Sequence, residues 1–136
     1  MAVADLNGDG ITDLATIHLG GASVGVHISN GDGTFRVGGY YSALGDTRSL
    51  AVRDFDLDGR TDLAVTYDRS DTDSAYVGVL LGNGDGTFRP AVGYLAGIGF
   101  WYELTTGDFN ADSKIDLATT TGPGSVRVSV LLNQSL

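Results

Sequence analysis

The chain contains no cysteine, few basic residues and no long apolar segment, and each absence excludes a class of function. Without cysteine there is no disulfide, no thiolate nucleophile and no zinc–thiolate site. Eight basic residues against 17 acidic ones give a formal charge of −9, which argues against nucleic acids and anionic membranes as partners. No segment approaches the roughly 18 apolar residues of a membrane span, so we expect no membrane insertion.

Helical periodicity is absent as well. No stretch of about ten residues keeps a 3.6-residue apolar period, so we expect essentially no helix. Hydrophobic residues make up 42% of the 136 residues, enough to bury the core of a single domain. The 21 glycines are about twice the usual share of ~7%, and most of them lie in clusters typical of turns.

Ten of the 17 acidic residues gather in three short segments that recur along the chain. These segments are DLNGDGITDL (5–14), DFDLDGRTDL (54–63) and DFNADSKIDL (108–117). A second motif keeps the same register, since SNGDGTF starts at residue 29 and GNGDGTF at residue 82. Periods of about 50 residues are typical of solenoids, propellers and arrays, and four short strands in such a period are typical of a propeller blade. The Asn-Gly of each NGDG predicts a type I′ hairpin turn.

The motif D-x-[DN]-x-D-G-x-x-D-L followed by V-x-V-L-L-x-N-G-D-G-T-F resembles the FG-GAP/VCBS repeat of integrin-like β-propellers, over nearly the whole chain. The resemblance implies an all-β fold of propeller blades, each of four antiparallel strands, in an incomplete propeller. It implies one partial domain, residues 1–136, with blades at about 1–44, 45–97 and 98–136, the third without its outer strand. The expected strands lie near 2–5, 13–19, 24–29, 34–40, 48–54, 62–68, 75–82, 87–93, 100–108, 116–121 and 125–132.

In this family the acidic turn joins the first two strands of a blade and binds calcium. Calcium takes about six to eight oxygen ligands, and alternate residues of a tight turn can point inward together. We therefore expect up to three Ca²⁺ ions, one in each turn, held by four side chains and one backbone carbonyl. The expected ligands are Asp5, Asn7, Asp9 and Asp13 with the carbonyl of Ile11; Asp54, Asp56, Asp58 and Asp62 with that of Arg60; and Asp108, Asn110, Asp112 and Asp116 with that of Lys114.

Two other interpretations of the turns have to be considered, and the sequence excludes one of them. An EF-hand is excluded, because its twelfth position holds Thr16, Val65 and Thr119 instead of glutamate. A solvated turn in which Asp and Asn only cap the backbone is the alternative to a metal site. Gly10 and Gly59 supply the sharp bend of the first two turns, whereas Ser113 replaces glycine in the third.

Nothing in the sequence supports an enzyme, because there is no Ser-His-Asp arrangement and no phosphate loop before a helix. His18 and His27 are interpreted as ordinary sheet positions. Trp101, Tyr102 and Glu103 are the candidate residues for a sugar or peptide ligand, and packing between blades is the alternative for them.

We expect a non-catalytic calcium-binding module for extracellular adhesion, scaffolding or protein interaction. A carbohydrate-binding lectin and an accessory domain of a secreted enzyme are the alternatives. No signal peptide is seen, and Met1 leads directly into a repeat, so we expect either an engineered boundary or the edge of a longer protein, which is secreted and extracellular or at the cell surface. The first and third blades each lack a neighbour, so we also expect self-association, with a dimer closing a ring of about six blades as one form.

Overall fold

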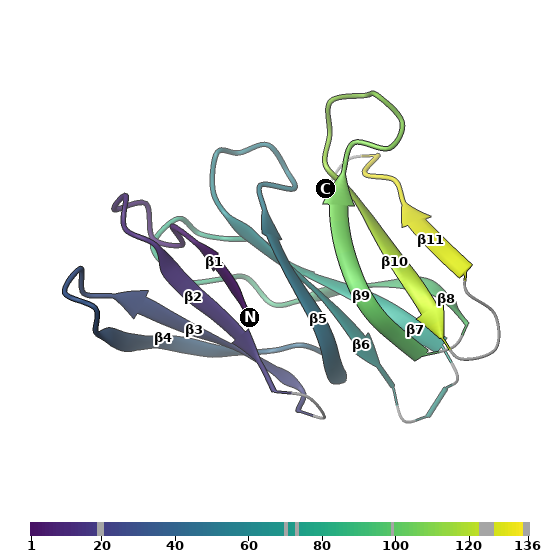
Figure 1. Ribbon diagram of the computed structural model, residues 1–136, viewed down its shortest axis with the longest axis horizontal. Coiled ribbons are helices and arrows are strands. Elements are labelled where there is room, and N and C mark those ends of the chain that lie inside the picture. Colours follow the sequence, from purple (N-terminus) through teal and green to yellow (C-terminus); the bar gives the residue numbers. More distant parts are fainter. Residues whose placement is uncertain (19–20, 70, 73, 99, 123–126, 135–136) are drawn as a thin grey trace.

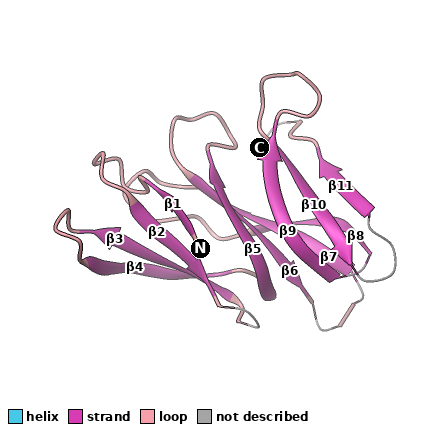
Figure 2. Ribbon diagram, in the orientation of Figure 1, coloured by secondary structure: helices cyan, strands magenta, loops and turns pink. Residues whose placement is uncertain are grey.

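The computed structural model covers the chain and describes residues 1–18, 21–69, 71–72, 74–98, 100–122 and 127–134, without the side chains of residues 100–102 and 121–122. All regular structure in these ranges is β-strand, in three antiparallel sheets (Figures 1 and 2). The first sheet contains β1 (Ala2–Ala4), β2 (Asp13–Ile17), β3 (Ser23–Ser29) and β4 (Phe35–Ser42). The second contains β5 (Asp46–Arg53), β6 (Asp62–Asp68), β7 (Ser74–Leu80) and β8 (Val92–Ile98). The third contains β9 (Phe100–Gly107), β10 (Asp116–Gly122) and β11 (Arg127–Leu131).

The strands of each sheet follow chain order from the inner strand outward, and no sheet closes on itself. The three sheets lie side by side with the second in the middle, and β5 contacts β1, β2 and β9 (Figure 1). This arrangement confirms the predicted all-β fold of blade-like sheets in an incomplete propeller. No described segment forms a helix of the length and hydropathy that a membrane crossing requires.

Two apolar clusters hold the sheets together, and β6 contributes to both. Every residue of β6 is buried. Because side chains alternate between the faces of a strand, Leu63 and Val65 join the cluster shared with the first sheet, and Ala64 joins the cluster shared with the third. The middle sheet is therefore covered on both faces.

The three acidic turns lie at one end of the sheets, where they connect β1 to β2, β5 to β6 and β9 to β10 (upper end in Figure 1). The second residue of the first two turns anchors the turn in the apolar interior. Leu6 is 2% exposed in the first cluster, and Phe55 is 1% exposed in the second. Phe109, in the same position of the third turn, is 50% exposed.

The predicted type I′ turn is wrong. Residues 30–34 form a longer loop, closed by the Asn30 N–H donating to the Thr34 carbonyl oxygen at 2.9 Å. Asp32 Oδ1 accepts from both the N–H and the hydroxyl of Thr34, at 2.9 and 2.6 Å. Left-handed backbone falls on Gly31 and Gly33, with φ of 78° and 89°, and not on Asn30. The Asp–Thr hydrogen bonds thus replace the tight turn, and residues 83–87 repeat the same contacts.

The strand predicted at 87–93 is also wrong, because β8 begins only at Val92. Pro90 has no N–H to donate to a strand ladder, so regular pairing cannot continue directly from the turn. Phe88 instead forms an isolated bridge with Gly82 and packs edge-on against Tyr41, with ring centroids 5.4 Å apart. The second repeat therefore uses the residues after its turn to contact the first sheet.

Gly82 and Gly78 provide a matched test of how closely the backbone at residue 82 approaches Thr61. A Cβ at Gly82 would overlap the carbonyl oxygen of Thr61, whereas a Cβ at Gly78 would meet ordinary contacts at 3.5 Å. We predict that Gly82→Ala lowers the free energy of unfolding by about 1–3 kcal/mol. Gly78→Ala should leave it unchanged or raise it by up to about 1 kcal/mol, because alanine loses less entropy on folding. Denaturant unfolding of both variants measures the difference, and equal effects would contradict the close approach.

Candidate metal centre

The first aspartate of each acidic turn orders the loop by accepting backbone N–H groups. Asp5 accepts from Gly8 and Gly10, each at 2.7 Å. Asp54 accepts from Gly59 at 2.8 Å, and Asp108 accepts from Ser113 at 2.9 Å. The hydrogen bond from Gly10 is the largest cause that lowers the pKa of Asp5, and that from Ser113 does the same for the pKa of Asp108. Both side chains are therefore carboxylates at neutral pH.

The third and fifth residues of each turn are held in the same way. Asp9, Asp58 and Asp112 each accept, through Oδ1, the N–H of the residue two positions later, at 2.8–2.9 Å. The donors are Ile11, Arg60 and Lys114, the residues whose carbonyls were predicted as ligands. The oxygen of the third residue in turn accepts the N–H of the fifth at 3.0–3.2 Å. Backbone N–H donors of the chain itself thus orient the side chains at positions 1, 3 and 5, independently of any bound ligand.

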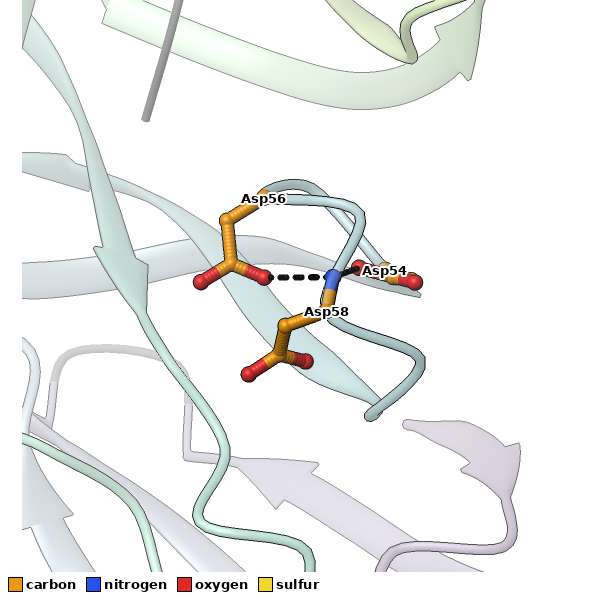
Figure 3. Close-up of side chains that lie close together, drawn as sticks. All are labelled: Asp54, Asp56 and Asp58. Atoms are coloured by element: carbon orange, nitrogen blue, oxygen red, sulfur yellow. Dashed lines mark hydrogen bonds between the residues drawn. The ribbon is translucent and has the colours of Figure 1, made fainter.

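The second turn brings three carboxylates together. Asp54, Asp56 and Asp58 each offer one oxygen, and these oxygens lie within 4.8 Å of one another. Figure 3 shows the three side chains around the Asp58 N–H, which donates to Asp54 and Asp56 at 3.2 Å. No other set of three His, Cys, Asp or Glu side chains in the described residues comes this close. The set can hold a metal ion, since carboxylate oxygens are the preferred ligands of hard divalent cations.

The first and third turns have an asparagine in the middle and behave differently. Asn7 Nδ2 donates to Asp9 Oδ2 at 2.9 Å, and Asn110 Nδ2 donates to Asp112 Oδ2 at 3.0 Å. The asparagine takes the place of a third carboxylate, and its amide attracts the neighbouring aspartate instead of repelling it. In the second turn Arg60 Nη1 lies 3.5 Å from Asp58 Oδ2, and the Arg60 side chain is half exposed. The second turn thus gathers more carboxylates than either of the other two.

The ninth residue of each turn has a second role that the sequence did not indicate. Asp13, Asp62 and Asp116 are all 0% exposed. Both oxygens of each carboxylate accept a backbone N–H, one from the second residue of the turn and one from the end of the third strand. For Asp62 these donors are Phe55 at 2.8 Å and Gly82 at 2.7 Å. The equivalent donors are Leu6 and Ser29 for Asp13, and Phe109 and Asn133 for Asp116.

These buried aspartates act as braces between turn and sheet. Asp62 does not belong to the close set of Asp54, Asp56 and Asp58. Burial is the largest cause that raises the pKa of Asp62, and the two N–H donors oppose it. Each carboxylate oxygen has a second lone pair, so a bracing aspartate retains acceptor capacity beyond its two N–H donors.

The sixth residue of every acidic turn has a left-handed backbone. Gly10 and Gly59 have φ of 81° and 84°, as their predicted place at the bend requires. Ser113 takes the same conformation with φ of 68°, although its Cβ makes this backbone unfavourable by about 1–2 kcal/mol. The third turn therefore keeps the shape of the other two without the glycine.

The other candidate residues lie apart from the turns. Trp101 and Tyr102 belong to β9, and their side chains are outside the described part of the structure. Glu103 is exposed, and its carbonyl oxygen accepts from the Thr119 hydroxyl at 2.8 Å. His27 Nε2 lies 3.2 Å from Thr16 Oγ1, while His18 is exposed beyond β2.

The repeated acidic turns and NGDGTF loops are the features from which the family of this chain is identified. The model of the FG-GAP-like repeat matches residues 5–65 and again residues 54–119, so that each match spans two acidic turns. The chain belongs to the FG-GAP-like repeat family. A search of curated proteins found no sequence similar to this one. Family and fold together make this chain a β-propeller-like repeat module.

Asp62 allows the bracing role to be measured. We predict that Asp62→Ala lowers the free energy of unfolding by about 2–6 kcal/mol, because two buried N–H groups lose their acceptor. Asp62→Asn should cost about 1–3 kcal/mol, because its NH₂ group must face one of the two N–H donors. Asp71→Ala, which breaks an exposed ion pair with Arg69, should cost less than about 1 kcal/mol.

All three variants should be unfolded with denaturant in excess chelator, so that metal occupancy cannot explain the differences. The role of Asp62 as a brace would be disproved by a cost of Asp62→Ala no larger than that of Asp71→Ala.

Proposed function

We propose that this chain is a calcium-binding, non-catalytic repeat module that serves extracellular adhesion, scaffolding or protein interaction. The observation that carries the proposal is the close set of Asp54, Asp56 and Asp58, whose oxygens lie within 4.8 Å of one another in a turn already ordered by backbone N–H groups.

Calcium is favoured over other cations by the chemistry of the donors. The turns offer carboxylate, amide and backbone carbonyl oxygens, and the chain has no cysteine. Such all-oxygen sets suit Ca²⁺, which accepts irregular shells of about six to eight oxygens, whereas Mg²⁺ prefers octahedral geometry with retained water. The resemblance to integrin-like propellers implies the same metal. Asp54, Asp56 and Asp58 would hold the ion in the second turn, with Asp62 and the Arg60 carbonyl as the further predicted ligands.

A bound cation would neutralise the negative charge of a turn whose base is already held against the sheet. The chain itself holds the turn against the sheet through Asp62, and the buried Phe55 fixes its base. Neutralising the carboxylates of Asp54, Asp56 and Asp58 would therefore stabilise the contact between β5, β6 and β7. Calcium modules of extracellular proteins work with dissociation constants of about 10⁻⁴–10⁻³ M, which a solvent-exposed turn of this kind can provide.

Chelation tests the calcium proposal. We predict that excess calcium raises the thermal midpoint above that in excess chelator, since a ligand at about 100 times its Kd adds about 2.7 kcal/mol of stability. Asp56→Asn gives the second turn the Asn pattern of the other two. This variant should therefore melt higher than the wild type in chelator and gain less from calcium.

Asp32→Asn is the control for this experiment, because it removes one exposed charge from a residue that is not a predicted metal ligand and keeps the Oδ1 acceptor for Thr34. Melting curves that coincide in calcium and in chelator would refute the calcium assignment.

We also propose that a second copy of the chain covers the exposed side of the third sheet. Phe109 is 50% exposed, although Leu6 and Phe55, its equivalents, are buried against the next sheet. The outer strand β11 exposes Val128 and Val130, at 66% and 44%, and has no further strand on its outer side in the described part of the chain. Free strand edges of this kind pair readily with another chain.

Sedimentation velocity at micromolar concentration in calcium tests the association. We predict a dimer or a larger assembly for the wild type and a monomer for Phe109→Asp, with little change in melting. Phe55→Asp is the matched comparison and should unfold the protein, because its side chain is buried. A wild type that sediments only as a monomer would refute the proposal.

A further inference from the structure

The second sheet carries an acidic hollow at the end away from its acidic turn. The hollow has a volume of about 350 Å³ and is lined by Leu44, Gly45, Asp46, Asp68, Arg69 and Asp71. Its size falls within the range of small ligand sites, about 300–1,000 Å³. Asp46 begins β5 and Asp68 ends β6, so the hollow lies at the opposite end of these strands from residues 54–61.

The charges around this hollow are not balanced. Asp46 and Asp68 are direct partners in the β5–β6 ladder, and like charges placed opposite each other destabilise a sheet. Arg48 Nε donates to Asp68 Oδ2 at 2.8 Å. The other oxygen, Asp68 Oδ1, is buried without a hydrogen-bond partner, in a residue that is only 8% exposed. Arg69 is engaged by Asp71 at 2.8 Å and lies over the ring of Tyr76.

Asp46 is therefore left without a counter-ion among the described residues. The buried Asp68 Oδ1 is the unusual member of the pair, because native structures leave few buried polar atoms unsatisfied, whereas the Asp46 carboxylate is exposed. A cation that reached both carboxylates from the hollow would offset their repulsion and could supply the hydrogen bond that Asp68 Oδ1 lacks.

The spacing of the acids decides which kind of cation fits. A divalent metal draws carboxylate oxygens to about 2.3–2.6 Å from one point. Asp46, Asp68 and Asp71 do not form a close set of that kind, whereas Asp54, Asp56 and Asp58 do. A guanidinium group spreads five N–H donors over a flat fork and reaches acceptors that lie further apart. Leu44, 46% exposed at the rim, offers an apolar wall for the stem of a long side chain.

We propose that this hollow binds the guanidinium group of an arginine side chain from a partner polypeptide. The guanidinium pairs with the Asp46 carboxylate at the rim and donates a second N–H to Asp68 Oδ1, and its positive charge offsets the like-charge pair that Asp46 forms with Asp68. The stem of the arginine packs on Leu44. The site is separate from the acidic turns and needs no metal.

A titration followed by NMR tests the proposal on the ¹⁵N-labelled chain. The probe is N-acetyl-arginine N-methylamide, and the matched control is its citrulline analogue, which has the same shape but no charge. The titration is run in excess calcium and again in excess chelator. We expect saturable shifts of the backbone amides of Asp46, Asp68 and Arg69 in both, with at least tenfold weaker binding of the citrulline compound.

Variants locate the binding charge. Asp46→Asn should weaken binding of the arginine probe at least fivefold and raise the thermal midpoint, because it removes the repulsion with Asp68. Asp46→Lys places a cation in the hollow from within the chain and should abolish binding while the fold is kept. Asp85→Asn removes a carboxylate from the other end of the sheet, keeps the Oδ1 that accepts from Thr87, and should leave binding unchanged.

The proposal is overturned by equal binding of the arginine and citrulline probes, by full affinity in Asp46→Asn, or by shifts confined to the acidic turns. Because the titration is repeated in chelator, a failure of the calcium proposal leaves its result unaffected.

Discussion

A buried aspartate that accepts two backbone N–H groups is the interaction on which each repeat depends. Asp13, Asp62 and Asp116 sit beneath their turns at 0% exposure and join the start of the turn to the end of the third strand. This contact fixes where the turn begins and how the third strand ends beside the second. Losing it would leave two buried donors unsatisfied, which is more costly than losing one hydrogen bond. The blade and the turn are therefore one unit rather than a sheet with a loop attached.

The rigidity of this brace explains why the acidic side chains of the turn stay close together. Once the turn is held at its base, the side chains at positions 1, 3 and 5 are oriented by backbone N–H groups and cannot move apart freely. An asparagine in the middle relieves the first and third turns, because its amide donates to the neighbouring carboxylate. The second turn has aspartate there, and its three carboxylates remain close together. The same scaffold thus supports turns that differ in how much they gain from a cation.

The repeat spacing and the resemblance to integrin-like propellers predicted most of the fold. The resemblance placed the three acidic segments between the first two strands of each blade, where the structure has them, and the strand expected at 62–68 is β6. The outer strand of the second repeat was misplaced because Pro90 delays pairing, an effect that the repeat pattern conceals. The hairpin was misassigned because Asp32 and Thr34 close a longer loop through their side chains.

The sites were predicted less completely than the fold. Spacing alone cannot separate a ligand from a brace, so the role of Asp62 emerged only from its two hydrogen bonds. The acidic hollow was not predicted at all, because Asp46 and Asp68 are distant in sequence and meet only through the register of β5 and β6. Because the two residues lie far apart along the chain, no local sequence motif predicts that they meet.

The central claim is that the acidic turns bind calcium. Isothermal titration of the chelator-stripped protein with calcium tests it most directly, because it counts the ions bound. The account predicts saturable binding of up to three ions, and a loss of one ion when Asp56 and Asp58 are both replaced by alanine. No saturable binding by the wild-type chain, or an unchanged number of ions in the double variant, would contradict it.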